Sequence, residues 1–180
     1  IGRILDALER RGWLEETYIF FSADHGEMLG DLGRYAKKYP YEPSLHVPLL
    51  AAGPGIAEGE TSDALVELID LNPTICDLAG LHRQPNIDAR SFRNVLVDPS
   101  RDHRDEAVSV MREWQCVRTQ RYKLVRNFND IDELYDLQED PQEQNNIYDQ
   151  MEEENPELIE DLVRRIHNRH IASPYGQPRD

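Results

Sequence analysis

The chain has 180 residues, of which 39% are hydrophobic and 31% charged, a composition typical of a globular protein with a sizeable core. The formal net charge of −15 comes with no dense basic patch, which argues against nucleic acid or an anionic membrane as a partner. No apolar run is long enough to span a bilayer, and the two cysteines suggest neither a disulfide framework nor a metal knuckle. The compartment and the oligomeric state stay open.

The first part of the chain predicts alternating helices and strands. The predicted segments are a helix over residues 2–11, a strand over 17–23, a long loop over 26–44, a strand over 46–52 and a helix over 65–81. The run at 17–23 is rich in β-branched and aromatic residues, which predicts a strand buried on both faces of a parallel sheet. In the helix over 65–81, Pro73 is expected to restart the helix as its first residue after an interruption.

The last part predicts a small antiparallel sheet covered by a helix. Its four strand-like segments, joined by short connections, are residues 106–112, 114–119, 122–127 and 133–137. Asn155 and Pro156 predict the start of a final helix, an asparagine cap followed by proline at the first helical position. The apolar face of this helix, which we expect to cover the sheet, consists of Leu158, Leu162, Val163 and Ile166.

Two stretches have no regular pattern. Residues 82–104 carry prolines and scattered charges and are interpreted as a linker, so we expect one domain over residues 1–100 and a smaller α+β subdomain over 101–180. Much of the acidic excess lies between residues 130 and 160, where there is no lysine or arginine. We interpret that stretch as a solvated face with turns, not as a binding surface.

The residues that carry candidate chemistry follow the strand over 17–23 directly. Asp24 and His25 lie just beyond its carboxyl end, where open α/β sheets bind their ligands. A carboxylate and an imidazole suit a divalent metal ion. Neighbouring residues of a regular strand point to opposite faces, so both can reach one ion only if the chain turns, which Gly26 permits.

Asp24 also begins a longer motif, Asp-His-Gly-Glu-Met-Leu-Gly-Asp, which Lys37, Tyr41-Glu42 and Val47-Pro48-Leu49 follow. In this order the motif resembles the sulfatase family of the alkaline phosphatase superfamily. Further matching blocks are Asp70-Leu71-Asn72-Pro73-Thr74, Val117-Arg118-Thr119, Arg121-Tyr122-Lys123 and Glu133-Leu134-Tyr135-Asp136-Leu137. The resemblance implies an α/β fold: part of an alkaline-phosphatase-like sandwich with a mainly parallel sheet, followed by a small antiparallel sheet packed by a carboxyl-terminal helix.

The resemblance further implies a metal-dependent hydrolase that acts on a small-molecule or carbohydrate sulfate ester. Asp24 and His25 would bind one divalent ion, Ca²⁺ before Mn²⁺ or Mg²⁺, and Lys37, thirteen residues after Asp24, would contact the ester. The residues themselves also allow plainer interpretations. Asp24 could cap a turn, and Lys37 with Lys38 could form a solvated basic pair. We interpret the other histidines of the matched region as surface or structural, namely His46, His82 and His103.

The chain departs from the family at the nucleophile. Sulfatases convert the Cys or Ser of a Cys/Ser-x-Pro-x-Arg motif into formylglycine, and neither Cys76 nor Cys116 lies in such a motif. We therefore expect a carboxyl-terminal portion of a larger enzyme, inactive alone, whose formylglycine lies in the other portion. Two alternatives stay open: a phosphonate or phosphate ester hydrolase of the same superfamily, and a non-catalytic domain retained for folding or binding.

Overall fold

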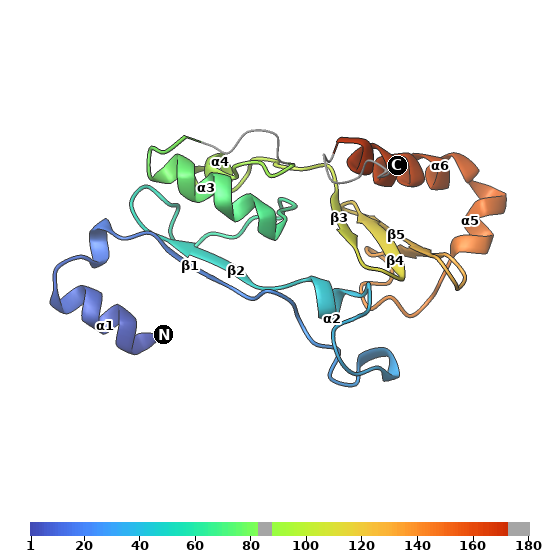
Figure 1. Ribbon diagram of the computed structural model, residues 1–180, viewed down its shortest axis with the longest axis horizontal. Helices are drawn as coiled ribbons and strands as arrows, with labels where there is room; N and C mark the ends of the chain where they lie inside the picture. Colours follow the sequence, from blue (N-terminus) through green and yellow to red (C-terminus); the bar gives the residue numbers. More distant parts are fainter. Residues whose placement is uncertain (83–87, 173–180) are drawn as a thin grey trace, which may run out of the picture.

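The computed structural model of the protein describes residues 1–82 and 88–172, in which two separate sheets form (Figure 1). The α-helices are α1 (Gly2–Arg10), α2 (Glu42–Leu45), α3 (Leu71–Leu78), α4 (Arg93–Val97), α5 (Tyr148–Glu154) and α6 (Pro156–Ala172). The strands are β1 (Ile19–Ser22), β2 (Leu49–Ala52), β3 (Ala107–Val110), β4 (Trp114–Arg118), β5 (Tyr122–Asn127) and β6 (Glu133–Asp136). Short 3₁₀ turns cover Leu14–Glu16, Asp31–Gly33 and Leu68–Asp70.

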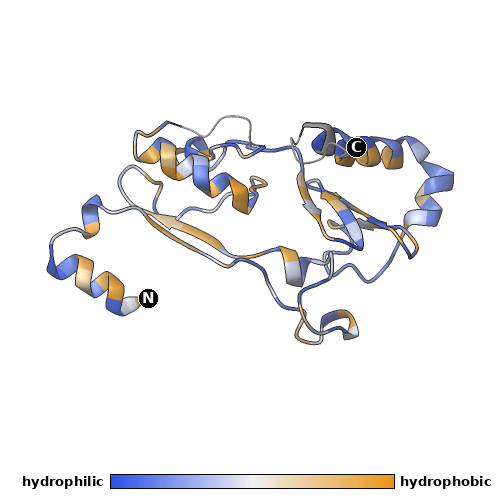
Figure 2. Cartoon of the chain, viewed as in Figure 1, coloured by the Kyte–Doolittle hydropathy of each residue, from blue (hydrophilic) through white to orange (hydrophobic). Residues whose placement is uncertain are grey.

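The first sheet pairs β1 with β2 in antiparallel register, with Phe21 opposite Leu50. On one face, the rings of Phe20 and Phe92 meet edge to face with centroids 6.5 Å apart. On the other face, Phe21 and Leu50 are 43% and 58% exposed, and Figure 2 shows both strands as hydrophobic. The burial on both faces that we predicted for this strand is therefore wrong within the described residues, and so is its parallel pairing. An apolar run indicates that a strand can be buried, but it does not identify the segment that covers it.

Helix α3 begins earlier than its proline suggested. The 3₁₀ turn Leu68–Asp70 leads directly into α3 at Leu71, so Pro73 is the third helical residue instead of the first. Proline is tolerated there because the N–H groups of a first helical turn have no intrahelical acceptor. Residues 65–67 form no helix, contrary to the prediction, and the backbone of Glu67 is extended. Part of the predicted linker is also ordered, since α4 lies within residues 82–104.

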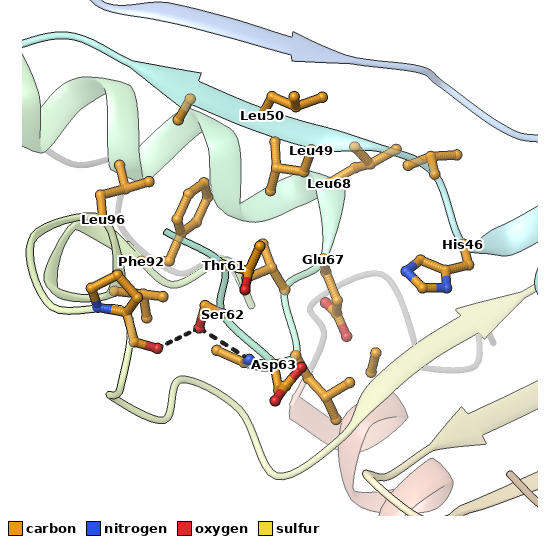
Figure 3. Close-up of a pocket in the computed structure, with 18 of the residues that line it drawn as sticks. His46, Leu49, Leu50, Thr61, Ser62, Asp63, Glu67, Leu68, Phe92 and Leu96 are labelled. Atoms are coloured by element: carbon orange, nitrogen blue, oxygen red, sulfur yellow. Dashed lines mark hydrogen bonds between the residues drawn. The ribbon is translucent and has the colours of Figure 1, made fainter. Parts of the chain in front are cut away.

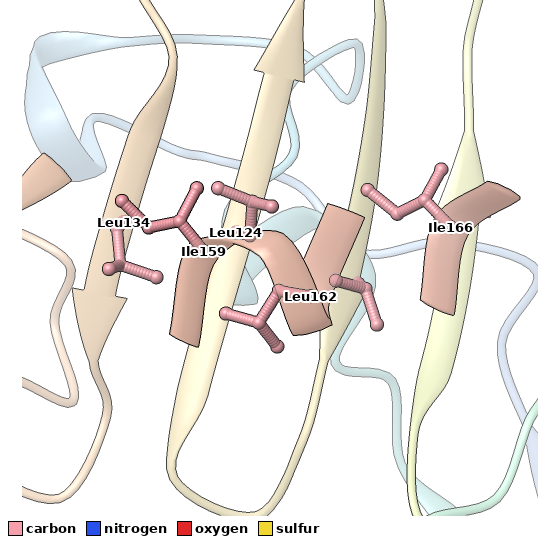
Figure 4. Close-up of a cluster of buried hydrophobic side chains, with 6 residues drawn as sticks. Leu124, Leu134, Ile159, Leu162 and Ile166 are labelled. Atoms are coloured by element: carbon pink, nitrogen blue, oxygen red, sulfur yellow. The ribbon is translucent and has the colours of Figure 1, made fainter. Parts of the chain in front are cut away.

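The second sheet confirms the predicted strands and hairpins. Its order is β3-β4-β5-β6, and all three neighbouring pairs are antiparallel. Helix α6 begins at Pro156, as predicted. One face of the sheet and one face of α6 share a buried core, which Figure 4 shows, formed by Val117, Leu124, Leu134, Ile159, Leu162 and Ile166.

The opposite face of this sheet is also buried, against the loop that follows β1. Successive residues of a strand point to opposite faces. Trp114, Cys116 and Val125 therefore pack away from α6, where Leu45 of α2 covers them. Tyr135 of β6 packs on the same side against Met28 and Tyr41 of the loop. Side chains from two distant parts of the sequence thus form one core, with α2 lying between the two sheets (Figure 1).

The acidic stretch forms more structure than predicted. Helix α5 lies within it and has no buried residue, in keeping with a solvated face. Glu143, by contrast, is only 3% exposed. Within residues 1–82 and 88–172, no helix combines the length and the apolar composition needed to cross a membrane. The division into domains at residue 100 stays a prediction.

The packing of α6 yields a stability prediction. Leu162 is 1% exposed inside the core, so Leu162→Ala should lower the free energy of unfolding by about 2–5 kcal/mol through lost burial and a residual cavity. The matched control on the same helix is Glu160→Ala, an exposed position whose substitution should cost less than about 0.5 kcal/mol. Urea denaturation followed by circular dichroism measures both. Equal effects would show that α6 does not cover the sheet.

Candidate active site

The three site residues predicted from the sequence converge at the carboxyl end of β1. Asp24 and His25 follow the strand directly, and the loop returns Lys37 to the same place. The Lys37 Nζ atom lies 2.5 Å from His25 Nε2, and His25 Nε2 lies 3.5 Å from Asp24 Oδ2. The side chain of Asp24 is 87% exposed and that of His25 36% exposed, so the group opens to solvent.

The hydrogen bonds of His25 indicate its tautomer. Its Nδ1 atom lies 2.8 Å from the carbonyl oxygen of Gly26. A carbonyl can only accept, so Nδ1 carries the hydrogen and Nε2 keeps its lone pair. The ammonium of Lys37 donates to that lone pair. A histidine that ligates a metal through Nε2 needs the same tautomer, with its other nitrogen bound to a carbonyl or carboxylate.

Gly26 matters through close packing. A Cβ on this residue would clash with the carbonyl oxygen of Pro43. The contact is close because the backbone at residues 26 and 27 donates to the carbonyls of Ser44 and Pro43, at 2.8 and 2.9 Å. From the sequence we expected Gly26 to permit a turn, whereas the structure requires glycine for the close approach of two backbone segments.

The loop between His25 and Lys37 holds its shape under backbone strain. The backbone enters the left-handed region at three residues, with φ values of 48° at Leu29, 53° at Leu32 and 73° at Ala36. Residues other than glycine and asparagine rarely adopt that region. Such conformations persist only where the surroundings determine them, and they gather at functional sites. The strained backbone at Ala36, one residue before Lys37, therefore fits a loop whose shape positions Lys37.

The donor set fits part of a metal shell. Asp24 and His25 supply a carboxylate oxygen and an imidazole lone pair on neighbouring residues, suitable for a divalent ion. Among the described residues, no group of three or more His, Cys, Asp or Glu side chains gathers to form a complete site. The described part of the chain thus offers two ligands of a shell that needs more.

Neither cysteine takes the place of a nucleophile. Cys116 is 2% exposed in β4, and burial raises the pKa of its thiol to about 11, so it stays protonated at neutral pH. Cys76 belongs to α3, outside the Asp24–His25–Lys37 group. His103 is structural, as interpreted from the sequence: its Nε2 lies 3.1 Å from Asp70 Oδ2, beside the Arg104 guanidinium that also binds Asp70.

The sequence missed a charged cluster next to the site, formed by Glu42, Lys123 and Glu143. Lys123 Nζ lies 2.7 Å from Glu143 Oε1 and 3.1 Å from Glu42 Oε1. Glu42 also contacts Arg118 Nε at 3.4 Å and His46 Nδ1 at 3.1 Å. A signal was present, since Lys123 stands in a strand between apolar residues. Its partners are 81 residues before it and 20 after it, too far for a local pattern to reveal.

The same cluster shifts three pKa values, that of Glu143 upwards because burial outweighs the opposing effect of Lys123. Burial would raise the pKa of Glu42, but the hydrogen bond with His46 and the charges of Lys123 and Arg118 outweigh it and lower that pKa to about 2. The hydrogen bond to Glu42 in turn raises the pKa of His46, against a smaller effect of burial. Glu42 is therefore an anion at neutral pH.

A broad open pocket of about 1810 Å³ extends from Asp24 and His25 along β2. Figure 3 shows its lining, with His46 at one end and an apolar wall that includes Leu49 and Leu68. Within the lining, the Ser62 hydroxyl donates a hydrogen bond to the carbonyl oxygen of Pro99 at 2.7 Å. The volume exceeds that of an ordinary small-molecule site, so the pocket could admit more than a single small ligand.

Residues 30–171 match the family model of the carboxyl-terminal part of N-sulphoglucosamine sulphohydrolase. Over 168 residues the chain is 36% identical to an N-acetylglucosamine-6-O-sulfatase of Bacteroides thetaiotaomicron; the alignment covers 84% of this chain and 30% of that relative. The chain thus spans about a third of the length of the relatives that it matches.

Solved structures agree with this likeness. A structure in complex with its substrate D-glucosamine-2-N,6-O-disulfate superposes with a TM-score of 0.86 at 30% identity, over 95% of this chain and 37% of that chain. A phosphonate monoester hydrolase from Silicibacter pomeroyi gives a TM-score of 0.76 at 28% identity, over 93% and 36% of the two chains. These superpositions confirm the predicted α/β class with its small antiparallel sheet and carboxyl-terminal helix.

The lowered pKa of Glu42 predicts how acid acts on the fold. A carboxyl group whose pKa falls from 4.5 to about 2 on folding stabilises the folded state above pH 4.5, and this stability is lost as the pH falls towards 2. Glu42→Gln removes the titrating group. Unfolding free energies from urea titrations between pH 6 and pH 2 should then fall less steeply for Glu42→Gln than for the wild type. Parallel curves would contradict the ion pairs of Glu42.

Proposed function

This chain belongs to the sulfatase family, and from that premise we propose that it forms the carboxyl-terminal part of a sulfuric ester hydrolase. The observation that carries the proposal is the convergence of Asp24, His25 and Lys37, residues 13 positions apart at the extremes, within hydrogen-bonding reach of one another. A domain retained only for folding or binding would not need an exposed ammonium placed on a histidine.

We propose a sulfated carbohydrate as the substrate. Support comes from the relative described as an N-acetylglucosamine-6-O-sulfatase and from the similar structure solved with a glucosamine disulfate. The open pocket beside Asp24 and His25 is compatible with a sugar ester. The net charge of −15 on this part of the protein disfavours a nearby anion, so a local cation such as Lys37 suits the point of contact with a sulfate ester.

Lys37 and the pair Asp24–His25 have separate roles in this proposal. The ammonium of Lys37 offsets the negative charge of the bound ester. It also offsets the charge that develops on the ester oxygens during the reaction. Asp24 and His25 Nε2 hold a divalent cation, Ca²⁺ in preference to Mn²⁺ or Mg²⁺, whose contribution when bound is Lewis-acid polarisation. A formylglycine nucleophile is placed outside residues 1–180, because these contain no Cys/Ser-x-Pro-x-Arg motif.

A phosphonate or phosphate ester is the second candidate substrate, favoured by the likeness to the phosphonate monoester hydrolase. The sulfatase reading fits better, since the structure in complex with a sulfated sugar superposes with the higher TM-score. Turnover of the full-length protein on an aryl sulfate and on the matching aryl phosphonate separates the two. A higher kcat/KM for the phosphonate would overturn the sulfatase assignment.

The metal pair predicts a selective loss of bound cation. Asp24→Ala in the full-length protein removes one ligand and should abolish stoichiometric Ca²⁺, measured by elemental analysis after dialysis. Asp31→Ala is the matched control, an exposed aspartate of the same loop that should leave the metal content unchanged. Full cation occupancy in Asp24→Ala would remove this residue from the proposed shell.

The two neighbouring lysines predict unequal kinetics. Lys37→Ala should lower kcat on an aryl sulfate by about 10²–10³, the usual loss for one electrostatic contact to developing charge, with a smaller change in KM. The side chain of Lys38 is exposed and has no predicted role, so Lys38→Ala should change the rate by less than about threefold. Steady-state kinetics of both variants in the full-length protein decides. A larger loss at Lys38 would show that the ester contact has been assigned to the wrong lysine.

A further inference from the structure

Lys123 is a buried charge in the centre of β5. Its side chain is fully buried, and it points away from α6 towards the loop that carries the candidate site. A buried ammonium is costly unless it is paired and hydrogen-bonded. Lys123 donates a hydrogen bond to Glu42 at 3.1 Å and forms an ion pair with Glu143 at 2.7 Å. The contact between Lys123 and Glu42 thus joins the second sheet to α2.

Glu143 adds a second, independent observation. Its φ of 55° places a residue other than glycine in the left-handed region, at a position that is 3% exposed. Its Oε2 atom accepts the backbone N–H of Glu42 at 2.7 Å, while Oε1 faces Lys123. Backbone strain of this kind persists where the surroundings over-determine it. Here the strained residue presents both carboxylate oxygens to two donors.

From Glu42 the contacts continue to Lys37. Within α2, the Ser44 hydroxyl donates to the carbonyl oxygen of Lys37 at 2.8 Å. The carbonyl oxygen of Ser44 accepts the N–H of Gly26, beside His25, at 2.8 Å. Trp114 of β4 donates its indole N–H to the carbonyl oxygen of Lys38 at 2.9 Å. The backbone of Lys37, and that of Gly26 next to His25, is therefore tied to α2, and α2 to the second sheet.

We propose that Lys123 and Glu143 are positioning residues that hold α2, and through Ser44 the backbone of Lys37 and Gly26, in the arrangement that brings Lys37 beside Asp24 and His25. Their role in this proposal is to hold the loop in place, not to contact a substrate. The catalytic consequence rests on the proposed function, because it needs Lys37 to act on an ester. The mechanical part does not: residues 36–46 are held in place by the buried ion pair between Lys123 of β5 and Glu143 of the segment that follows β6.

Hydrogen exchange in the full-length protein tests the mechanical part without any assay of activity. Lys123→Met removes the ammonium, and peptides covering residues 36–46 should exchange faster. Arg121→Met is the matched control on the same strand hairpin, because it breaks an exposed ion pair with Asp136 that does not touch the loop. Unchanged exchange in residues 36–46 of Lys123→Met overturns the proposal.

Glu143→Gln covers the case in which Lys123→Met does not fold. An amide has one acceptor oxygen where the carboxylate has two, so the variant must lose its contact with either Lys123 or the Glu42 N–H. Exchange should again rise in residues 36–46 and stay at the wild-type level in α6. A uniform rise across the protein would mean a general loss of stability and would refute positioning.

A double-mutant cycle with Lys37 tests the catalytic part. Displacing a catalytic group slightly costs up to about 10²-fold in rate, so Glu143→Gln should lower kcat on an aryl sulfate by about 10-fold or more. In the Lys37→Ala background the same substitution should change kcat by less than about twofold, because the group it positions is gone. Equal losses in both backgrounds overturn positioning through Lys37. Suppose that Lys37→Ala has wild-type kinetics while exchange in residues 36–46 still rises in Lys123→Met. Positioning by Lys123 and Glu143 would then stand, and the proposed function would fail.

Discussion

The fold around the candidate site depends on one electrostatic requirement: the ammonium of Lys123 is buried and must be paired. Its partners Glu143 and Glu42 lie at 2.7 and 3.1 Å and come from opposite sides of β5 in the sequence. Removing one partner of a buried ion pair leaves an uncompensated charge, which is among the most destabilising changes a protein can undergo. This requirement makes the loop after β1 part of the same packed unit as the carboxyl-terminal sheet.

Several features follow from that union. The sheet has two buried faces, a wholly apolar one under α6 and a mixed one under α2 and the loop. On the mixed face, Tyr41 and Tyr135 both donate to Glu133, and burial together with this carboxylate raises the pKa of each phenol. The two phenols and Glu133 are therefore matched with one another, which favours a single register of the loop against the strands.

Sequence patterns predicted the second sheet well because its determinants are local. Alternating side chains and short connections define β3 to β6, and Asn155 with Pro156 marks the start of α6. The site residues Asp24, His25 and Lys37 were also predicted, through a motif, and the structure brings them together. Their roles stay a prediction. Whether the second face of β1 is buried, by contrast, depends on the segments packed against it, and no local sequence pattern identifies those.

The features that the sequence did not predict are those set by distant partners. Glu143 looked like one acidic residue among many, yet it is buried because Lys123 and the Glu42 N–H need acceptors. Gly26 looked like a turn residue, yet its lack of a side chain matters because Pro43 lies against it. Pro73 was expected to begin its helix, but the preceding 3₁₀ turn moves the start to Leu71. The differences at Glu143 and Gly26 trace to tertiary contacts, and the one at Pro73 to the adjacent 3₁₀ turn.

The two-sided burial of β5 has a consequence for how its sequence can vary in length. Leu124 faces α6 and Lys123 faces Glu42, so neighbouring positions serve opposite cores. Inserting or deleting a single residue at the start of this strand would exchange the two sets. It would place an ammonium inside the apolar helix interface and a leucine beneath two carboxylates. Substitutions at one position alter one interface, whereas a change in strand length disrupts both at once.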